Sequence, residues 1–410
     1  MTAATADSDL AAAASVALPA LVELRRELHQ VPEVGLQLPR TRAAILRALE
    51  GLDLELTVYD EFSGVAAVLR GAEPGPVVLL RGDMDALPIV EETGLDFAAP
   101  GSNMHACGHD LHMTMLVGAA RLLAARRDRM AGSVIFMFQP GEEGYFGARH
   151  MIEAGVLDVA GSRPEAAYAL HVAPGQVRRR VVATRPGALL ASADRLLVTV
   201  RGASGHGARP HLAVDPVPVA AEIVTALSTA VTRQFDVFDP VVLSVGMFHA
   251  GTAHNVIADT ATLEATLRTF RPETRERLGR VAIQVSRSVG AAHGVEVDAA
   301  VERLYPATVN DEAATARVLT VAERLFGAPL VETFPHPLPG AEDFSFVLEA
   351  VPGALAFLGV CVPGRDPASA PYNHSSRALY DDDLLADGAR LLAALALEHV
   401  AADRPDGMHP

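Results

Sequence analysis

The sequence predicts an α/β protein that carries a smaller, inserted α+β domain. Short apolar runs and helix-like stretches alternate over residues 18–175, whereas the strand-like stretches of residues 194–304 have alternating polar positions. A chain of 410 residues is also too long for one ordinary core. We therefore place the first part of the larger domain at residues 1–187, the insertion at 188–304 and the second part at 305–410.

In the first part, residues 18–28 ("LPALVELRREL") and 41–51 ("TRAAILRALEG") have the apolar spacing of amphipathic helices. Four apolar runs rich in Val, Ala and Leu follow, at residues 63–71, 76–88, 132–144 and 165–175. Runs that are apolar at consecutive positions are typical of strands buried on both faces. The helical stretch at 111–130 covers such a sheet.

The insertion has a different order of elements. Its stretches predict, in sequence, a strand, a helix, two strands, a helix and a strand, at residues 194–202, 213–231, 240–251, 259–270, 272–292 and 295–304. The order βαββαβ predicts a ferredoxin-like antiparallel sheet with one open face. Helix-like residues 317–327 and a last helix near the C-terminus return to the first domain.

Charge and cysteine content limit the partners. Lys+Arg 34 against Asp+Glu 50 give a net charge of -16, which disfavours nucleic acid and anionic membrane surfaces. The N-terminal stretch is acidic where a secretory signal is basic, and no apolar run approaches the ~18 residues of a membrane span, so we expect a cytoplasmic protein. A disulfide between Cys107 and Cys361 is possible but unsupported, and Cys361 is predicted to lie in the core.

Candidate ligands follow the buried strands. Asp83 and Asp85 end one apolar run, Glu142 and Glu143 follow another, and His171 ends a third. Carboxyl ends of strands are where sites assemble in α/β sheets. The stretch "NMHACGHDLH" (103–112) adds a thiol and imidazoles, most notably Cys107 and His109. Sulfur, nitrogen and carboxylate ligands together suit Zn²⁺, with Mn²⁺, Co²⁺ or Fe²⁺ as alternatives.

The two adjacent glutamates have different predicted roles. Neighbours in an extended segment point in opposite directions, so one of Glu142 and Glu143 can bind a metal while the other serves as general base. Cys107 and His109, one glycine apart, can face the same side and act as two ligands. A cysteine nucleophile with His109 as its base is an alternative, and so is an incidental cluster in a buried turn.

Ordered motifs resemble one family over nearly the whole chain. The motifs are "RGDMDALP", "MHACGHDLH", "QPGEEGYFGARHMIEAG", "ALHVAPG", "GHGARPH", "HNVIAD", "LRTF", "GAEDFSF" and "YNHSS". They are similar to the amidohydrolase branch of the aminoacylase and carboxypeptidase family of dinuclear metallohydrolases, which includes hippurate hydrolases and auxin-conjugate hydrolases. Gly141 and Ala258 depart from the usual residues but remove no functional side chain.

The resemblance implies two divalent metal ions, Zn, Mn or Co, in a metallopeptidase-type domain with a mixed, largely parallel sheet. Cys107 resembles a thiolate that bridges the two metals. Four further residues resemble the remaining metal ligands, namely His109, Glu143, His171 and His374.

Catalytic and substrate-binding roles follow from the same resemblance. Glu142 resembles the general acid/base, and Asp85 resembles a carboxylate that orients a ligating histidine. In the inserted lid and dimerisation domain, His206 resembles an oxyanion-stabilising histidine that is often contributed across a homodimer interface. Asn255 and Arg268 resemble groups that hold the substrate carboxylate.

Other polar residues near these motifs have plainer interpretations. We expect His105 and His112 to support ligands or pack the helix, and Asp110 to cap the following helix. Asp83 is either a supporting carboxylate or a cap at the end of its strand. We expect Glu342 and Asp343 to hold the C-terminal part of the site in place.

The predicted activity is metal-dependent hydrolysis of the amide bond of N-acyl amino acids by metal-activated water. A dipeptidase or carboxypeptidase of the same architecture is the alternative. A non-catalytic metal-binding protein is the alternative from another class, but a structural zinc site has a closed ligand shell and no spare carboxylate beside it. Glu142 beside Glu143 therefore favours an enzyme.

Overall fold

The computed structural model describes residues 3–401, with side chains from Asp7 onward. The two predicted parts of the larger domain, 1–187 and 305–410, include residues 1–2 and 402–410, which lie outside this range. The chain forms two compact units: unit 1 comprises residues up to Leu189 together with Val309–His336 and the chain from Phe346, and unit 2 comprises Leu190–Thr308 and Pro337–Ser345. The short segment Pro337–Ser345 thus groups with unit 2, which the sequence pattern does not indicate.

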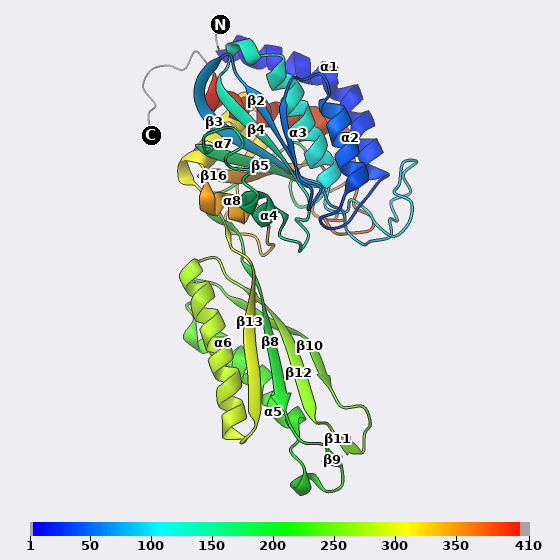
Figure 1. The fold of residues 1–410 in the computed structure, drawn as a ribbon, viewed down its shortest axis with the longest axis vertical. Helices are drawn as coiled ribbons and strands as arrows, with labels where there is room; N and C mark the ends of the chain where they lie inside the picture. Colours follow the sequence, from blue (N-terminus) through cyan, green and yellow to red (C-terminus); the bar gives the residue numbers. More distant parts are fainter. Residues whose placement is uncertain (1–2, 402–410) are drawn as a thin grey trace. The chain divides into compact units, whose positions relative to one another are not determined.

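Unit 1 is built around an eight-stranded sheet of order β1-β2-β4-β3-β5-β16-β6-β15 (Figure 1). Its strands are β1 (Glu55–Val58), β2 (Val65–Arg70), β3 (Glu73–Asp83), β4 (Ala131–Gln139), β5 (Ala166–Ala173), β6 (Val182–Thr184), β15 (Val331–Thr333) and β16 (Gly353–Gly359). Two further strands, β7 (Gly187–Leu190) and β14 (Thr308–Asn310), pair with each other.

The centre of this sheet is parallel. Strand β3 pairs in parallel with β4 and β5, and β5 pairs in parallel with β16, while β1, β2 and β6 add antiparallel pairings. The continuous apolar runs of β4 and β16 are buried along nearly their whole length, as both faces of the sheet are covered. The predicted mixed, largely parallel sheet is confirmed, and the carboxyl ends of β3, β4 and β5 meet at one edge.

Helices complete unit 1. They are α1 (Ala3–His29), α2 (Pro39–Leu49), α3 (His109–Ala124), α4 (Gly147–Glu153), α7 (Glu312–Phe326), α8 (Ser345–Ala350) and α9 (Leu385–Val400). Helix α3 is buried almost throughout because α1 and α9 pack against it and the sheet lies beneath it. Its first residue, His109, therefore begins a helix whose position is fixed by the core.

Unit 2 has the order β8-α5-β10-β12-α6-β13, so its elements lie where the sequence predicts them. They are β8 (Ala193–Arg201), α5 (Pro216–Gln234), β10 (Val242–Ala250), β12 (Thr260–Arg268), α6 (Pro272–Ala292) and β13 (Glu296–Tyr305). The antiparallel sheet has the order β10-β12-β8-β13, and its apolar side chains pack against the two helices in a separate core. Strand β10 is an edge strand.

A small ribbon extends unit 2 at one end of this sheet. Strands β9 (Gly205–His206) and β11 (Val256–Ile257) pair antiparallel just beyond the position where Arg201 of β8 faces Thr260 of β12. Figure 1 shows β9 and β11 past the end of the four long strands. The ribbon was not predicted, and it carries one of the predicted catalytic histidines.

Both cysteines are free and buried, and Cys361 lies in the core as predicted. Among the helices of residues 3–401, none is both long enough and apolar enough to cross a membrane.

Candidate metal centre

A tight loop presents the thiol of Cys107. Met104 pairs with Leu87, and the chain then turns into α3 through Gly108, whose φ is 86°. A side chain at Gly108 would place its Cβ 2.4 Å from Cγ2 of Val172, so only glycine fits this left-handed, closely packed position. Cys107 and His109 therefore flank a glycine that the packing requires.

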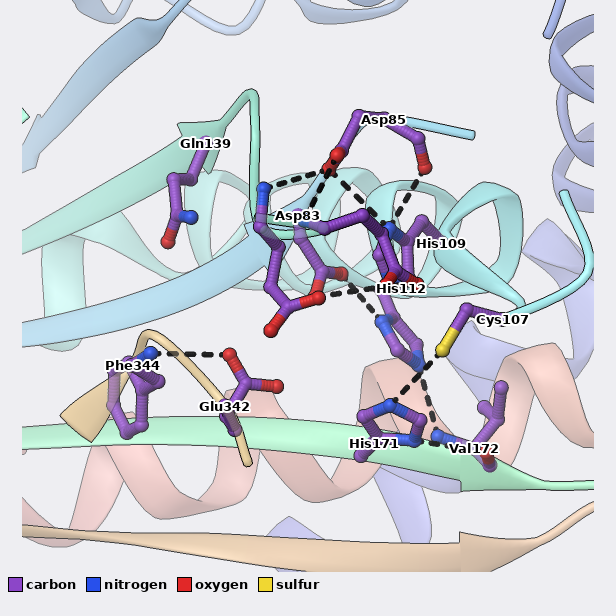
Figure 2. A network of polar contacts seen from close by, with 12 residues as sticks. Asp83, Asp85, Cys107, His109, His112, Gln139, His171, Val172, Glu342 and Phe344 are labelled. Carbon is purple, nitrogen blue, oxygen red and sulfur yellow. Dashed lines mark hydrogen bonds and ion pairs between the residues drawn. The ribbon is translucent and has the colours of Figure 1, made fainter. Parts of the chain in front are cut away.

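The ring orientations of His109 and His171 are fixed by backbone carbonyls. Nδ1 of His109 donates to the carbonyl of Asp85 at 2.8 Å, and Nδ1 of His171 donates to the carbonyl of Val172 at 2.9 Å. With Nδ1 of each ring turned to a carbonyl, Nε2 is the atom that faces the cluster, and on His109 it lies 3.4 Å from Oδ2 of Asp83. Nε2 of His171 lies 3.5 Å from Sγ of Cys107, and Nε2 of His109 is buried with no hydrogen-bond partner among residues 3–401 (Figure 2).

His112 is engaged on both sides of its ring. Nδ1 contacts Oδ1 of Asp83, at 2.5 Å, and Nε2 accepts the backbone N–H of Val172 at 2.8 Å. No lone pair remains for a metal, so His112 supports the site by fixing the end of β5, as expected. Asp83 is in turn held by Arg81 at 2.7 Å. Although burial alone would raise the pKa of Asp83, Arg81, His109 and His112 hold it well below the usual value.

Asp85 positions the two glutamates through their backbone. Its Oδ1 accepts the N–H of Glu142 at 2.9 Å, and its Oδ2 accepts the N–H of Glu143 at 3.0 Å. The predicted contact with a ligating histidine is made mainly by the backbone carbonyl, because Nδ1 of His109 lies 3.5 Å from the carboxylate and 2.8 Å from the carbonyl. Both carboxylate oxygens are therefore used to fix the turn after β4.

His374 reaches the same place from the C-terminal segment. Its Nε2 lies 3.1 Å from Oε1 of Glu143, and its side chain is 54% exposed. The backbone of His374 has a φ of 68°, which is uncommon for a residue other than glycine. Such a conformation persists only where surrounding contacts hold it.

The five predicted ligands form two groups that share one residue. Ligand atoms of Cys107, His109 and His171 lie within 4.8 Å of one another, and so do those of Cys107, Glu143 and His374. A thiolate common to two groups is the geometry expected of a bridging ligand. The structure thus brings together all five residues that sequence reasoning singled out, while their assignment as ligands stays a prediction.

The electrostatics of this cluster favour a bound cation. Burial, and then Glu143, Glu142 and Asp83, raise the pKa of the Cys107 thiol well above its usual value. Burial would lower the pKa of His109, but Asp83, Asp85 and Glu143 outweigh it and raise the pKa to about 10. The same carboxylates that attract a proton to His109 attract a metal ion.

The donor set therefore fits divalent metals. Nε2 of His171 offers a lone pair, and Nε2 of His109 offers one when a metal displaces its proton. Cys107 offers a sulfur that a metal would deprotonate, and Oε1 of Glu143 lies 3.1 Å from Nε2 of His374 and 4.0 Å from Nε2 of His109. Sulfur, nitrogen and carboxylate donors in this mixture suit Zn²⁺ and related ions.

Sequence reasoning missed a second buried charge network beside the loop. Oδ2 of Asp110 lies 2.9 Å from Nε of Arg25 and 2.8 Å from Nδ1 of His29, and both partners come from α1. Nε2 of His29 lies 3.1 Å from Glu91. The expectation that Asp110 caps α3 is wrong, because Gly108 is the N-cap and α1 supplies a charge partner for the carboxylate. His105 lies fully buried nearby, and burial lowers its pKa to about 3.

His206 is oriented as a hydrogen-bond donor in unit 2. Nδ1 of His206 accepts the N–H of Ala208 at 3.0 Å, so Nε2 carries the proton of the neutral ring. The carbonyl of Asn255 accepts the N–H of Gly207 at 2.8 Å, which keeps His206 and Asn255 on the same small ribbon.

Arg268 lies at the other end of the same sheet. It is the last residue of β12, whose first residue, Thr260, stands beside the ribbon. At about 3.4 Å per residue, the eight steps of this strand place Arg268 about 27 Å from Thr260. Unit 2 therefore does not bring His206 and Arg268 together.

Comparison with known proteins identifies the family. The sequence model of "Peptidase family M20/M25/M40" matches residues 79–398. The chain belongs to this peptidase family. The resemblance read from the motifs is confirmed, and membership in the M20/M25/M40 family makes the protein a hydrolase that acts on amide bonds, as predicted.

Proteins of named activity are similar to this chain over most of its length. "Thermostable carboxypeptidase 1" of Saccharolobus solfataricus is 34% identical over 92% of this chain and 95% of its own length. "N-acetylcysteine deacetylase" of Bacillus subtilis is 34% identical over 92% of this chain and 96% of its own. A crystal structure is known of a Bacillus subtilis protein described as a dinuclear metal binding peptidase from the M20 family. Its sequence is 31% identical to this chain, and the two structures align with a TM-score of 0.80 over 93% of this chain and 97% of that chain.

Proposed function

We propose that this protein is a metal-dependent amidohydrolase that cleaves N-acyl amino acids to a carboxylate and a free amino acid. The observation that carries the proposal is the pair of ligand groups sharing Cys107, with the buried carboxylate of Glu142 beside them. The deacetylase of Bacillus subtilis and the dinuclear peptidase structure support both the reaction and two metal ions. Divalent ions at the two groups would supply Lewis-acid chemistry and acidify water.

The general acid/base role is assigned to Glu142. Its backbone is fixed by Asp85, and its carboxylate lies within 4.8 Å of Glu143 and His109, whereas the contact with His374 is made by Glu143. Glu142 takes a proton from the attacking water and then gives it to the amide nitrogen that leaves. Removal of its carboxylate therefore affects proton transfer rather than the binding of a metal.

A cysteine hydrolase is disfavoured by the environment of Cys107. The thiol is buried, and the surrounding carboxylates raise its pKa, whereas a nucleophilic cysteine needs a lowered pKa. His109, the base in that alternative, has its Nδ1 bound to a carbonyl, and His171 is the ring that contacts the sulfur.

Substrate contacts from unit 2 complete the proposal. Arg268 binds the substrate carboxylate with paired hydrogen bonds. Asn255 lies on the ribbon with His206, so it can join Arg268 at one substrate only from a second chain. His206 donates its Nε2–H to the oxygen that becomes negatively charged as the amide carbonyl is attacked. In an N-acyl amino acid only a few bonds separate the carboxylate from the carbonyl. One chain cannot supply both Arg268 and His206 to one substrate over about 27 Å.

We therefore propose a homodimer in which each site uses His206 of the neighbouring chain. The edge strand β10 supports this role for unit 2. Met247 and Phe248 on this strand are 46% and 40% exposed, and one side of its backbone is free to pair with a second strand. A cytoplasmic location, inferred from the N-terminal stretch and the lack of a long apolar run, and a lack of nucleic-acid or membrane partners, inferred from the net charge, remain predictions.

A substrate comparison tests the proposed reaction. The protein is stripped with a chelator, reloaded with Zn²⁺, Mn²⁺ or Co²⁺, and assayed on N-acetyl and N-benzoyl amino acids and on dipeptides of the same amino acids. We expect activity to return with metal and to favour the N-acyl compounds. A preference for dipeptides would support the carboxypeptidase or dipeptidase alternative that the Saccharolobus relative suggests. Activity that survives complete metal removal would contradict both.

A further inference from the structure

Asn373 joins two segments of the candidate metal centre. Its Nδ2 donates to the carbonyl of Cys107 at 2.9 Å and to the carbonyl of Val172 at 3.1 Å. Because both partners are carbonyl oxygens, only the NH₂ end of the amide can face them, so the orientation of the side chain is determined. The sequence motif around His374 gave no role to this neighbour.

The two carbonyls belong to the ligand framework itself. One is the backbone oxygen of Cys107, whose sulfur lies 4.0 Å from the same Nδ2. The other, on Val172, also accepts Nδ1 of His171 and thereby sets the direction of the ligand atom Nε2. A single amide group therefore contacts the residue shared by both ligand groups and the carbonyl that orients a second ligand.

The next residue in the chain is a third candidate ligand. The N–H of His374 donates to the carbonyl of Ala106 at 2.8 Å, and the hydroxyl of Tyr380 donates to the same oxygen at 2.7 Å. These bonds and those of Asn373 hold the C-terminal segment against residues 106 and 107. They also hold His374 in its left-handed backbone conformation.

We propose that Asn373 is a positioning residue that sets the spacing of Cys107, His171 and His374, one from each of three chain segments. The inference rests on the proposed metal-dependent function. Partners of metal ligands that fix ligand direction typically change metal affinity by about 10- to 100-fold when they are removed. Loss of the Asn373 amide should therefore weaken metal binding more than it weakens the fold.

Asn310 offers a matched control within the same unit. Its Nδ2 donates to the carbonyls of Arg185 and Leu355 at 3.0 Å each, and its Oδ1 accepts the N–H of Leu355 at 2.8 Å. Like Asn373 it ties together segments that are distant in the sequence, but it bonds to no candidate ligand. A purely structural loss should thus appear equally in Asn310→Leu and Asn373→Leu, since leucine keeps the volume and removes the hydrogen bonds.

The test uses Co²⁺ as a probe of the full-length wild type and both variants. Three quantities are measured: the Co²⁺ dissociation constant by titration of stripped protein, the intensity of the cobalt–thiolate charge-transfer absorption, and the alkylation rate of Cys107 at saturating Co²⁺. Peptide mapping separates Cys107 from Cys361, and the melting temperature of the stripped protein reports the fold.

For Asn373→Leu we expect Co²⁺ affinity to fall at least about tenfold, the thiolate absorption to weaken and alkylation of Cys107 to accelerate. Asn310→Leu should lower the melting temperature and leave all three metal readouts at wild-type values. If Asn373→Leu is insoluble, Asn373→Ser is judged by the same criteria. Unchanged metal readouts in a folded Asn373 variant, or equal changes in the Asn310 variant, would overturn the role of Asn373 and leave the proposed metal function standing. A wild type that shows no cobalt–thiolate absorption would overturn the proposed metal function and this inference together.

Discussion

Asp85 accepts the backbone N–H of Glu142 through Oδ1 at 2.9 Å, and this bond holds the turn on which the candidate acid/base stands. The second oxygen of Asp85 holds Glu143 in the same way. One carboxylate at the end of β3 thus places two adjacent glutamates whose proposed tasks differ. The division of tasks can be tested by changing each glutamate alone.

Glu142→Gln should keep its metal and lose at least about 100-fold in kcat, because the amide cannot transfer protons but removes no ligand. Glu143→Gln is the matched variant, and it should lose metal as well as activity. Metal stoichiometry and kcat are measured on the same preparations. Loss of metal from Glu142→Gln with retention in Glu143→Gln would reverse the two assignments.

Arg268→Ala should chiefly raise KM for N-acyl amino acids, because the guanidinium binds the carboxylate equally in the ground state and the transition state. Arg195→Ala is a suitable control on the same sheet, since Arg195 is half-exposed and pairs only with surface carboxylates. Steady-state kinetics give KM and kcat for both variants. A fall in kcat at unchanged KM would argue that Arg268 does not hold the substrate carboxylate.

Chains with complementary defects should restore activity when mixed. His206→Ala and Glu142→Gln chains are each inactive, but a mixed dimer contains one site with both residues intact if His206 serves its neighbour. Refolding equal amounts together should recover about a quarter of wild-type activity per chain, assuming random pairing and independent sites. With subunit exchange demonstrated by mass-tagged chains, a mixture without activity would rule out a shared site.

The stability contributed by His29 should depend on pH. Burial lowers the pKa of His29, but Asp110 and Glu91 outweigh it and raise the pKa above 6.5. A raised pKa in the folded state means that the extra stability is complete below pH 6.5 and disappears as the pH rises through the folded value. His29→Gln, which breaks a buried ion pair, should cost about 3 kcal/mol at low pH.

The measurement is the free energy of unfolding of metal-free wild type and of His29→Gln, from below pH 6.5 to above the pKa of His29 in the folded protein. His293→Gln is the control, because His293 pairs with Glu222 at the surface. The difference between wild type and His29→Gln should shrink as the pH rises. A difference that grows with pH would show that His29 is neutral in the folded protein.

The meeting of ligands at one sheet edge was predictable, whereas their orientation was not. Asp83, Glu142 and His171 follow apolar runs, and parallel strands bring such ends together. The direction of each imidazole depends on which backbone carbonyl lies beside it, as for His109 and the carbonyl of Asp85. Contacts of this kind join segments far apart in the chain and leave no pattern in the sequence.

Sequence patterns also did not reveal the charged side chains that are buried on amphipathic helices. Arg25 lies one helical turn from Leu21 and Leu28 on the buried face of α1, where charged residues are uncommon, and its side chain is only 1% exposed. Its burial depends on Asp110 of α3, a partner that only the packed structure reveals. The distance between His206 and Arg268 was likewise accessible only once the register of β8 and β12 was known.

The central claim is that Cys107 is shared by two metal ions. The most direct measurement is anomalous diffraction from crystals grown with Mn²⁺ or Zn²⁺, recorded at the absorption edge of the metal. We predict two anomalous peaks beside Sγ of Cys107, one near His109 and His171 and the other near Glu143 and His374. Both peaks should be lost or weakened in Cys107→Ser. A fully loaded crystal with no anomalous peak beside Cys107, or with a single one, would contradict the account.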